Sequence, residues 1–426
     1  MSLQVTSTGA PPAHSRLSWR PWAVSISVAI VYFLAARLSL ALLDKADGVA
    51  LFWPAAGVAT GTLVAFGATM RWPVVIGVVA ATLAANLLGD RNLASTAFFS
   101  VANAAGPVIA AGLIQRFHGA PFELDELRRI LGFFGATILA ALASGIVGTF
   151  GFLYFHASTS AAVTIWRHWV VSESLGTITV APLVIGLASF LRHAPPKREI
   201  AEGTFALVIV ATLSLLLVVL PNEPWTIELA IAALSPLFVW IAARVRPAFT
   251  AVATFMCTIT VVWTTIFSIG LFGDVRLPIE ERVLSAQATI LATSFGALVL
   301  AALFSERRTH ELAILERERR LEEVLRAGGV ITFEFDLHAG QITLSPNATE
   351  ILGLGAKQSL TSAEWVERVH PDDRASIAAR LDSADGEQRS QSMMFRFQRP
   401  DAAKSGWKKS QLRTWTQRES RHASMG

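Results

Sequence analysis

The sequence predicts a polytopic α-helical membrane protein of about ten spans, followed by a cytoplasmic α+β domain that is incomplete. Of the 426 residues, 53% are hydrophobic and 16% are charged, against about 25% charged residues in an ordinary soluble domain. The chain has 36 basic and 32 acidic residues, and 37 of these follow Phe304. A membrane part and a smaller water-soluble part are therefore expected. The single cysteine, Cys257, excludes a disulfide framework and a cysteine-based metal site.

Ten apolar stretches approach the roughly 20 residues that a helix needs to cross a bilayer. They are 22–43, 49–69, 72–89, 94–114, 131–155, 169–191, 204–220, 225–243, 248–272 and 283–304. Residues 1–21 are expected to form a cytoplasmic tail, and residues 22–304 an integral membrane domain. The first stretch contains Arg37 and is too long for a cleaved signal peptide.

The basic residues of the loops predict the orientation. With a cytoplasmic N-terminus and alternating loops, eleven Lys and Arg residues face inward and five face outward. The positive-inside rule therefore favours an even number of spans, with both termini cytoplasmic. Because most early Lys and Arg flank hydrophobic stretches, the net charge of +4 does not indicate nucleic-acid binding.

Several polar and aromatic residues lie at one expected depth. Glu173 interrupts the apolar run WRHWVVSESLGTITVAP (166–182). It lies roughly 6 Å from the expected outer end of its span. A carboxylate at that depth is energetically costly unless it is paired with a cation or a hydrogen-bond donor. Arg37 lies roughly 9 Å from the outer end of the first span. We hypothesise a shallow outward-facing sensing cavity in which Arg37 pairs with Glu173, lined also by Trp53, Asn86 and Trp169. The alternative is that interfacial charges snorkel and the Trp residues form an aromatic belt.

These stretches resemble a known family. FWPAAG (52–57), RWPVVIGVVAATLAANLL (71–88) and W-x-x-x-E-x-L-G with a following proline (169–182) are similar to the bacterial membrane-associated sensor domain of the first type (MASE). The resemblance covers about residues 25–305 and departs from the family at Glu173, where Asp is usual. It implies an N-terminal sensory module of histidine kinases and diguanylate cyclases, without a known ligand.

Residues 305–327 are charged and helix-favouring, and predict a signalling helix. Ile314, Leu321 and Val324 fit heptad seam positions, with Arg317 as a polar interruption. A weak coiled coil and a single solvated helix both fit this pattern. Either form can pass a rotation or shift from the last span to the next domain.

Residues 328–401 alternate between strand and helix patterns. Strands are expected at VITFEFDL (330–337), QITLS (341–345) and QSMMFRF (391–397), and helices at NATEILGL (347–354), AEWVERV and DDRASIAARL. This order, with WVERVHPDDRASI, resembles a PAS domain. Its motif is His370, Pro371, Asp372, Asp373 and Arg374. His370 is expected as a turn residue and not as a haem or metal ligand.

The PAS resemblance ends near Asp401. Without the last two strands of such a domain the sheet has an open edge, so we expect a truncated PAS domain and a disordered or aberrant tail at 402–426. The absence of cysteine from this part excludes covalent flavin photochemistry, and no cofactor is indicated.

The features together predict a bacterial inner-membrane sensory receptor. An unknown small ligand or envelope stimulus would act in the bilayer and signal through the helix to the PAS domain, as the input half of a two-component sensor histidine kinase. The alternatives are the input half of a diguanylate cyclase, a secondary transporter with Arg37, Asn86, Asn103 and Glu173 on its path, and a decayed reading frame. No kinase H-box, ATP-binding glycine box, GGDEF or EAL run occurs, so no catalysis is expected of this chain alone. The resemblance also implies a homodimer.

Overall fold

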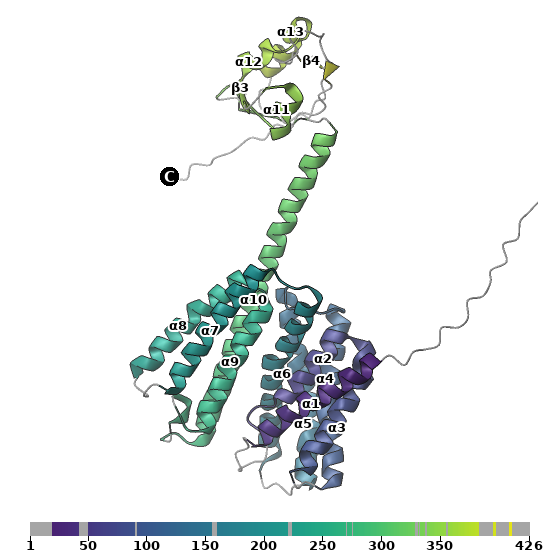
Figure 1. Cartoon of the computed structure of the whole chain (residues 1–426), viewed down its shortest axis with the longest axis vertical. Coiled ribbons are helices and arrows are strands. Elements are labelled where there is room, and N and C mark those ends of the chain that lie inside the picture. Colours follow the sequence, from purple (N-terminus) through teal and green to yellow (C-terminus); the bar gives the residue numbers. More distant parts are fainter. Residues whose placement is uncertain are drawn as a thin grey trace, which may run out of the picture. The chain divides into compact units, whose positions relative to one another are not determined.

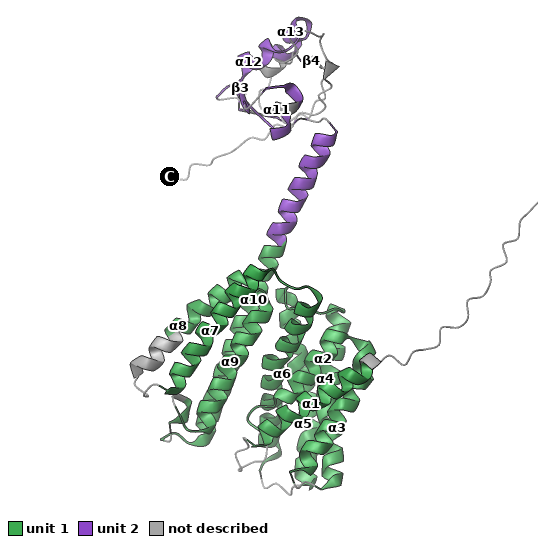
Figure 2. Cartoon of the chain, in the orientation of Figure 1, with its two compact units in different colours: residues 1–309 green, residues 310–426 purple. Residues whose placement is uncertain are grey.

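The computed structural model describes residues 19–41, 50–89, 92–155, 160–219, 224–269, 271–274, 276–328, 331, 333–336, 339–354, 357–382, 395–397 and 409–410 (Figure 1). The chain divides into two compact units, residues 1–309 and residues 310–426 (Figure 2).

The first unit is a bundle of helices joined by short connections (Figure 1). In the described part of this unit the α-helices are α1 (Trp19–Ala41), α2 (Pro54–Phe66), α3 (Arg71–Leu87), α4 (Leu93–His118), α5 (Leu127–Phe155), α6 (Ala162–Arg192), α7 (Lys197–Val219), α8 (Pro224–Arg244), α9 (Pro247–Ile266) and α10 (Ile279–Ala327). Short 3₁₀ turns, η1 (Ala68–Met70) and η2 (Leu271–Gly273), precede α3 and follow α9.

Each of the ten predicted stretches contains a helix, but one of these helices, α2, is too short for a full span. Among the described residues, eight helices are long and apolar enough to cross a membrane. Helix α2 has 13 residues, which at 1.5 Å per residue is about 20 Å against a hydrocarbon core of about 30 Å. Helix α8 has 21 residues, and its described segment Ala232–Arg244 is apolar.

Helix α2 lies in the interior of the bundle, where every residue from Pro54 to Ala65 is buried. It packs most extensively against α6, and also against α4 and α1. Its sequence, PAAGVATGTLVAF, is rich in Gly and Ala, and small residues allow helix backbones to approach closely within a membrane. The lack of long side chains thus explains why this short helix is surrounded by others.

Helix α10 joins the predicted last span and the predicted connector in one helix of 49 residues. The part beyond residue 305 is stabilised by ion pairs one turn apart, from Arg320 to Glu316 at 2.9 Å and from Arg319 to Glu323 at 3.4 Å. The division between the two units falls inside α10, after Thr309.

The second unit contains a small antiparallel sheet and three short helices. Strands β1 (Phe333–Asp336), β2 (Gln341–Leu344) and β3 (Ser359–Thr361) pair in the order β1-β2-β3, and β4 (Phe395–Arg396) pairs with β5 (Lys409–Ser410). The helices are α11 (Pro346–Leu352), α12 (Ser362–Glu367) and α13 (Pro371–Asp382). The buried core includes Ile342, Leu360, Trp365, Val369 and Phe397.

Two strands of this unit differ from the prediction. β3 was missed because three residues, Ser-Leu-Thr, are too few to show an alternating pattern. β5 lies within the tail that was expected to be disordered, and the two residues described there pair with β4. The rest of that tail, and much of the predicted strand 391–397, lies outside the described residues.

Candidate functional site

Glu173 lies deeper along its helix than the sequence predicted. Helix α6 begins at Ala162, seven residues before the expected start, so Glu173 is about 16 Å from the helix start at 1.5 Å per residue. Its side chain is buried, with 8% of the residue exposed. The carboxylate is therefore an interior group of the bundle.

Two neutral donors bind the Glu173 carboxylate. The indole N–H of Trp169, one turn earlier on α6, donates to Oε2 at 2.8 Å, and the Ser144 hydroxyl of α5 donates to the same oxygen. The other oxygen, Oε1, lies against Gly106 of α4, where a Cβ atom would overlap it. The glycine at position 106 thus makes room for the carboxylate.

The predicted pair between Arg37 and Glu173 is wrong. Within the part of the chain that the structure describes, no ion pair joins them, and Arg37 Nη1 instead donates to the Ala85 carbonyl at 3.4 Å. Helix α1 packs mainly against α3 and α2, whereas α6 packs against α2, α5 and α9. Arg37 therefore faces the end of α3.

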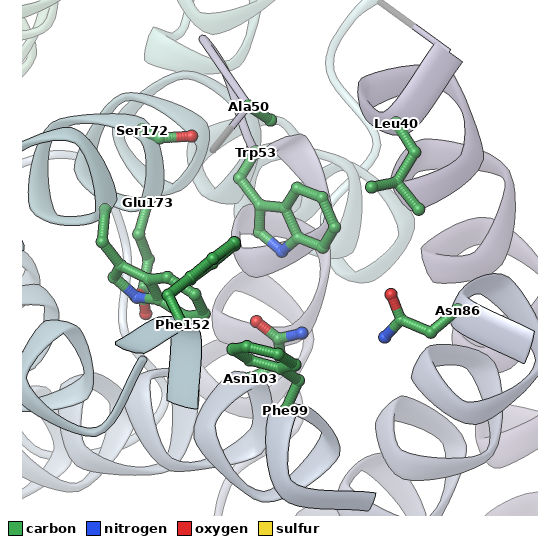
Figure 3. Close-up of a pocket in the computed structure, with 10 residues that line it drawn as sticks. Leu40, Ala50, Trp53, Asn86, Phe99, Asn103, Phe152, Ser172 and Glu173 are labelled. Atoms are coloured by element: carbon green, nitrogen blue, oxygen red, sulfur yellow. The ribbon is translucent and has the colours of Figure 1, made fainter. Parts of the chain in front are cut away.

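A cavity lies beside Glu173 between the helices of the bundle. It is lined by Leu40, Ala50, Trp53, Asn86, Phe99, Asn103, Phe152, Trp169, Ser172 and Glu173 (Figure 3). The centre of a water molecule can occupy about 50 Å³ of it, which is room for a few non-hydrogen atoms. Arg37 is not among the lining residues.

Four of the five residues predicted for a sensing cavity, Trp53, Asn86, Trp169 and Glu173, line this space. The sensing role itself stays a prediction. Phe99 and Phe152 were missed because a phenylalanine in an apolar helix gives no sign of which neighbour it faces. Asn103 had been noted only for the transporter alternative, although a polar amide in an apolar helix already indicates an interior position.

Polar groups with unused hydrogen-bonding capacity face the cavity. The Asn86 amide is 5% exposed, and neither it nor the Asn103 amide forms a hydrogen bond within the described ranges. The buried indole nitrogen of Trp53 makes no hydrogen bond of ordinary geometry, although the Tyr32 hydroxyl lies beside it. Figure 3 shows the Trp53 ring and both amides directed into the same space.

The residues before α2 connect the cavity wall with two other helices. The backbone N–H of Trp53 donates to the Ser172 carbonyl of α6 at 3.2 Å, and Gln287 Nε2 of α10 donates to the Leu51 carbonyl at 3.3 Å. Phe52 is buried in one apolar cluster with Val262 of α9 and Ile290 of α10. We call residues 50–53 the coupling segment. Non-helical backbone inside a membrane bundle is tolerated where protein surrounds it or it lines a cavity.

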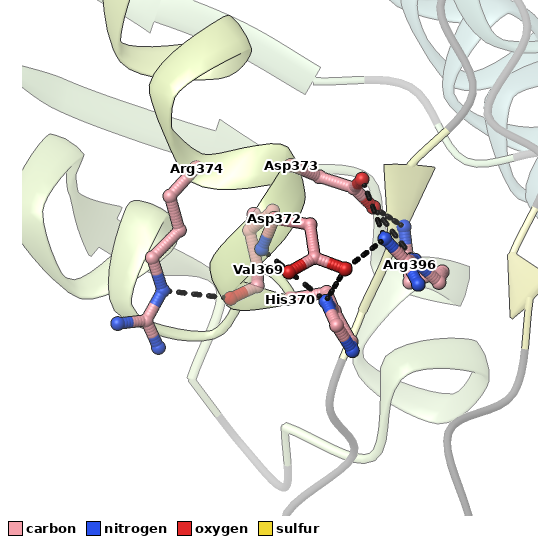
Figure 4. Close-up of polar contacts among 6 residues, drawn as sticks. All are labelled: Val369, His370, Asp372, Asp373, Arg374 and Arg396. Carbon is pink, nitrogen blue, oxygen red and sulfur yellow. Dashed lines mark hydrogen bonds and ion pairs between the residues drawn. The ribbon is translucent and has the colours of Figure 1, made fainter.

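The predicted PAS motif holds α13 against β4. Asp373 accepts hydrogen bonds from the Arg396 backbone N–H and guanidinium at 2.9–3.0 Å, and Asp372 accepts one from the same guanidinium at 3.0 Å (Figure 4). These hydrogen bonds lower the pKa of Asp373 from 3.8 to about 2.

The rest of the motif forms the turn before α13. His370 donates its backbone N–H to the Arg396 carbonyl at 2.9 Å, and Pro371 begins α13. Arg374 donates to the Val369 carbonyl (Figure 4) and also to the Glu367 carbonyl. The motif therefore acts as a structural clamp in this unit.

Comparison with known proteins gives one match. The MASE1 family model matches residues 23–308, which include every residue that lines the cavity. No curated protein and no solved structure matches the chain.

Proposed function

The chain belongs to the MASE1 family of membrane sensory domains found in signalling proteins, and we propose that the cavity is its input site and α10 its output. The coupling segment carries this proposal. Trp53 lines the cavity, while Leu51 and Phe52 contact Gln287 and Ile290 on α10. A molecule that displaces Trp53 therefore shifts backbone to which α10 is hydrogen-bonded.

Helix α10 is suited to carry such a displacement beyond the membrane domain. It is unbroken from Ile279 to Ala327, so movement near Gln287 is not absorbed by a hinge. Arg308, near the end of the membrane unit, donates to the Val245 carbonyl at 2.9 Å, and Glu306 accepts from the Leu127 N–H at 3.2 Å. These contacts define a resting position from which the helix can shift.

We further propose a bacterial inner-membrane location with both termini cytoplasmic, which the positive-inside count supports. The second unit is a PAS-type module in this proposal, supported by the succession of its strands and helices along the chain and by its clamp motif. The whole is then the input half of a sensor histidine kinase, with a diguanylate cyclase as the alternative.

A homodimer through α10 completes the proposal. Beyond the membrane unit, Ile314, Leu321 and Val324 are 54–67% exposed and recur at heptad positions along α10. A second copy of the same helix would cover this apolar seam.

The coupling can be tested in the full chain by electron paramagnetic resonance. Spin labels at Trp72→Cys and Leu303→Cys, in a Cys257→Ser background, report the distance between α3 and α10. Trp53→Ala should shift this distance distribution, because it empties the cavity wall next to the coupling segment. Trp166→Ala is the matched control, since the Trp166 indole donates to the Leu142 carbonyl of α5 at 3.3 Å and does not line the cavity.

Superimposable distributions for Trp53→Ala and the parent would contradict the proposal. Net solute flux in vesicles containing the intact chain would instead favour the transporter alternative.

A further inference from the structure

We propose that the cavity beside Glu173 binds a small organic ammonium ion, either a free primary amine or the amine of a lipid headgroup. This ligand would be the stimulus of the proposed input site. Only its role in signalling rests on the proposed function, whereas its binding does not. Binding itself follows from charge, aromatic walls and hydrogen-bond acceptors that face one space.

The first reason is a buried carboxyl group that has no cationic partner among the described residues. Glu173 is buried and accepts hydrogen bonds only from the neutral groups of Ser144 and Trp169. Arg37, the cation that the sequence had suggested as its partner, donates to the Ala85 carbonyl. A buried carboxylate without a cation is strongly disfavoured relative to one that is paired. A cationic ligand supplies the missing charge.

The second reason is the aromatic character of the walls. Trp53, Phe99, Phe152 and Trp169 line the cavity, and Phe99 has ring centroids 5.1 Å from Phe152 and 6.1 Å from Trp169. Aromatic faces around a desolvated space attract an ammonium group through the ring quadrupole, with tryptophan the most effective. The same walls repel an anionic ligand.

The third reason is the supply of acceptors. The amides of Asn86 and Asn103 have no hydrogen-bond partner among the described residues and point into the cavity (Figure 3). A primary ammonium carries three N–H donors and no acceptor. The two amide oxygens and the Glu173 carboxylate are acceptors of the kind that such donors require. The volume of about 50 Å³ fits a group of a few non-hydrogen atoms.

The test is direct binding of radiolabelled methylammonium to the full chain in nanodiscs of phosphatidylglycerol. We expect saturable binding that methanol, a neutral molecule of similar size, does not displace. Glu173→Gln should weaken binding at least tenfold, because it keeps the shape and removes the charge. Glu202→Gln, whose carboxylate pairs with Arg198 and Arg244 outside the cavity, should bind as the parent does.

Asn103→Leu provides a second variant in case Glu173→Gln does not fold, and should also lose binding at least tenfold. Nanodiscs that contain phosphatidylethanolamine identify the source of the amine: reduced methylammonium binding assigns the site to the headgroup, and unchanged binding assigns it to a free amine. The absence of saturable binding by the folded parent, equal binding by folded Glu173→Gln, or displacement by methanol overturns the inference. These experiments measure binding and not signalling. The coupling between the cavity and α10 is tested separately, by the electron paramagnetic resonance experiment described above.

Discussion

Replacing Gly176 by alanine should disrupt the contact between α2 and α6. A Cβ atom at position 176 would overlap the backbone carbonyl of Trp53. That backbone cannot move aside easily, because Trp53 N–H donates to Ser172 and the neighbouring Leu51 carbonyl accepts from Gln287. Overpacking of a well-packed interior costs about 1–3 kcal/mol, and loss of the bond from Trp53 to Ser172 adds about 0.5–1.5 kcal/mol.

We therefore expect Gly176→Ala to lower the free energy of unfolding by about 1.5–4.5 kcal/mol, measured by titration of the detergent-solubilised chain with dodecyl sulfate. Gly135→Ala is the matched control, since no atom lies within 4 Å of a Cβ built there. Alanine at that helical position should be neutral or stabilising by up to about 1 kcal/mol. Equal unfolding free energies for the two variants would refute the close approach of α2 and α6.

Two further predictions concern the second unit and α10. Because the folded-state pKa of Asp373 is about 2 and its ordinary value is 3.8, its contacts with Arg396 should stabilise the fold fully above pH 4. That contribution should fade as the pH falls from 4 towards 2. Asp373→Asn should show reduced amide protection of residues 395–397 already at neutral pH, and unchanged protection in hydrogen exchange corrected for intrinsic rates would count against the clamp. In a Cys257→Ser background, Ile314→Cys should form an intermolecular disulfide in membranes far faster than Arg319→Cys on the opposite face of α10; equal rates would exclude the proposed seam.

Much of the membrane domain could be predicted from the sequence, because a helix that crosses a bilayer needs an apolar stretch of about 20 residues. The same reasoning overestimated the length of helix α2. Its stretch is apolar for 21 residues, but Trp53 and Pro54 place the helix start inside the bundle. Whether an apolar stretch contacts lipid or other helices depends on tertiary packing, which hydropathy does not report.

Part of the cavity lining could be predicted from the sequence, but the contacts of Glu173 could not. Polar residues in apolar helices are expensive unless they face the interior, so Asn86 and Glu173 could be selected from the sequence. Their partners could not, because the rotation of each helix decides which group meets which. Arg37 was chosen for its charge and expected depth, whereas Ser144 and Trp169, both neutral, are the groups that contact Glu173.

The most direct measurement of the link between cavity and output helix is a double-mutant cycle for Trp53→Ala and Gln287→Leu, with the free energy of unfolding as readout. Gln287 is hydrogen-bonded to the backbone of the coupling segment, which also carries Trp53. Residues in such a shared network typically show interaction energies of roughly 0.5 kcal/mol or more. We predict a coupling energy of at least about 0.5 kcal/mol. Additivity within about 0.3 kcal/mol would contradict the account, because the cavity would then be energetically independent of α10.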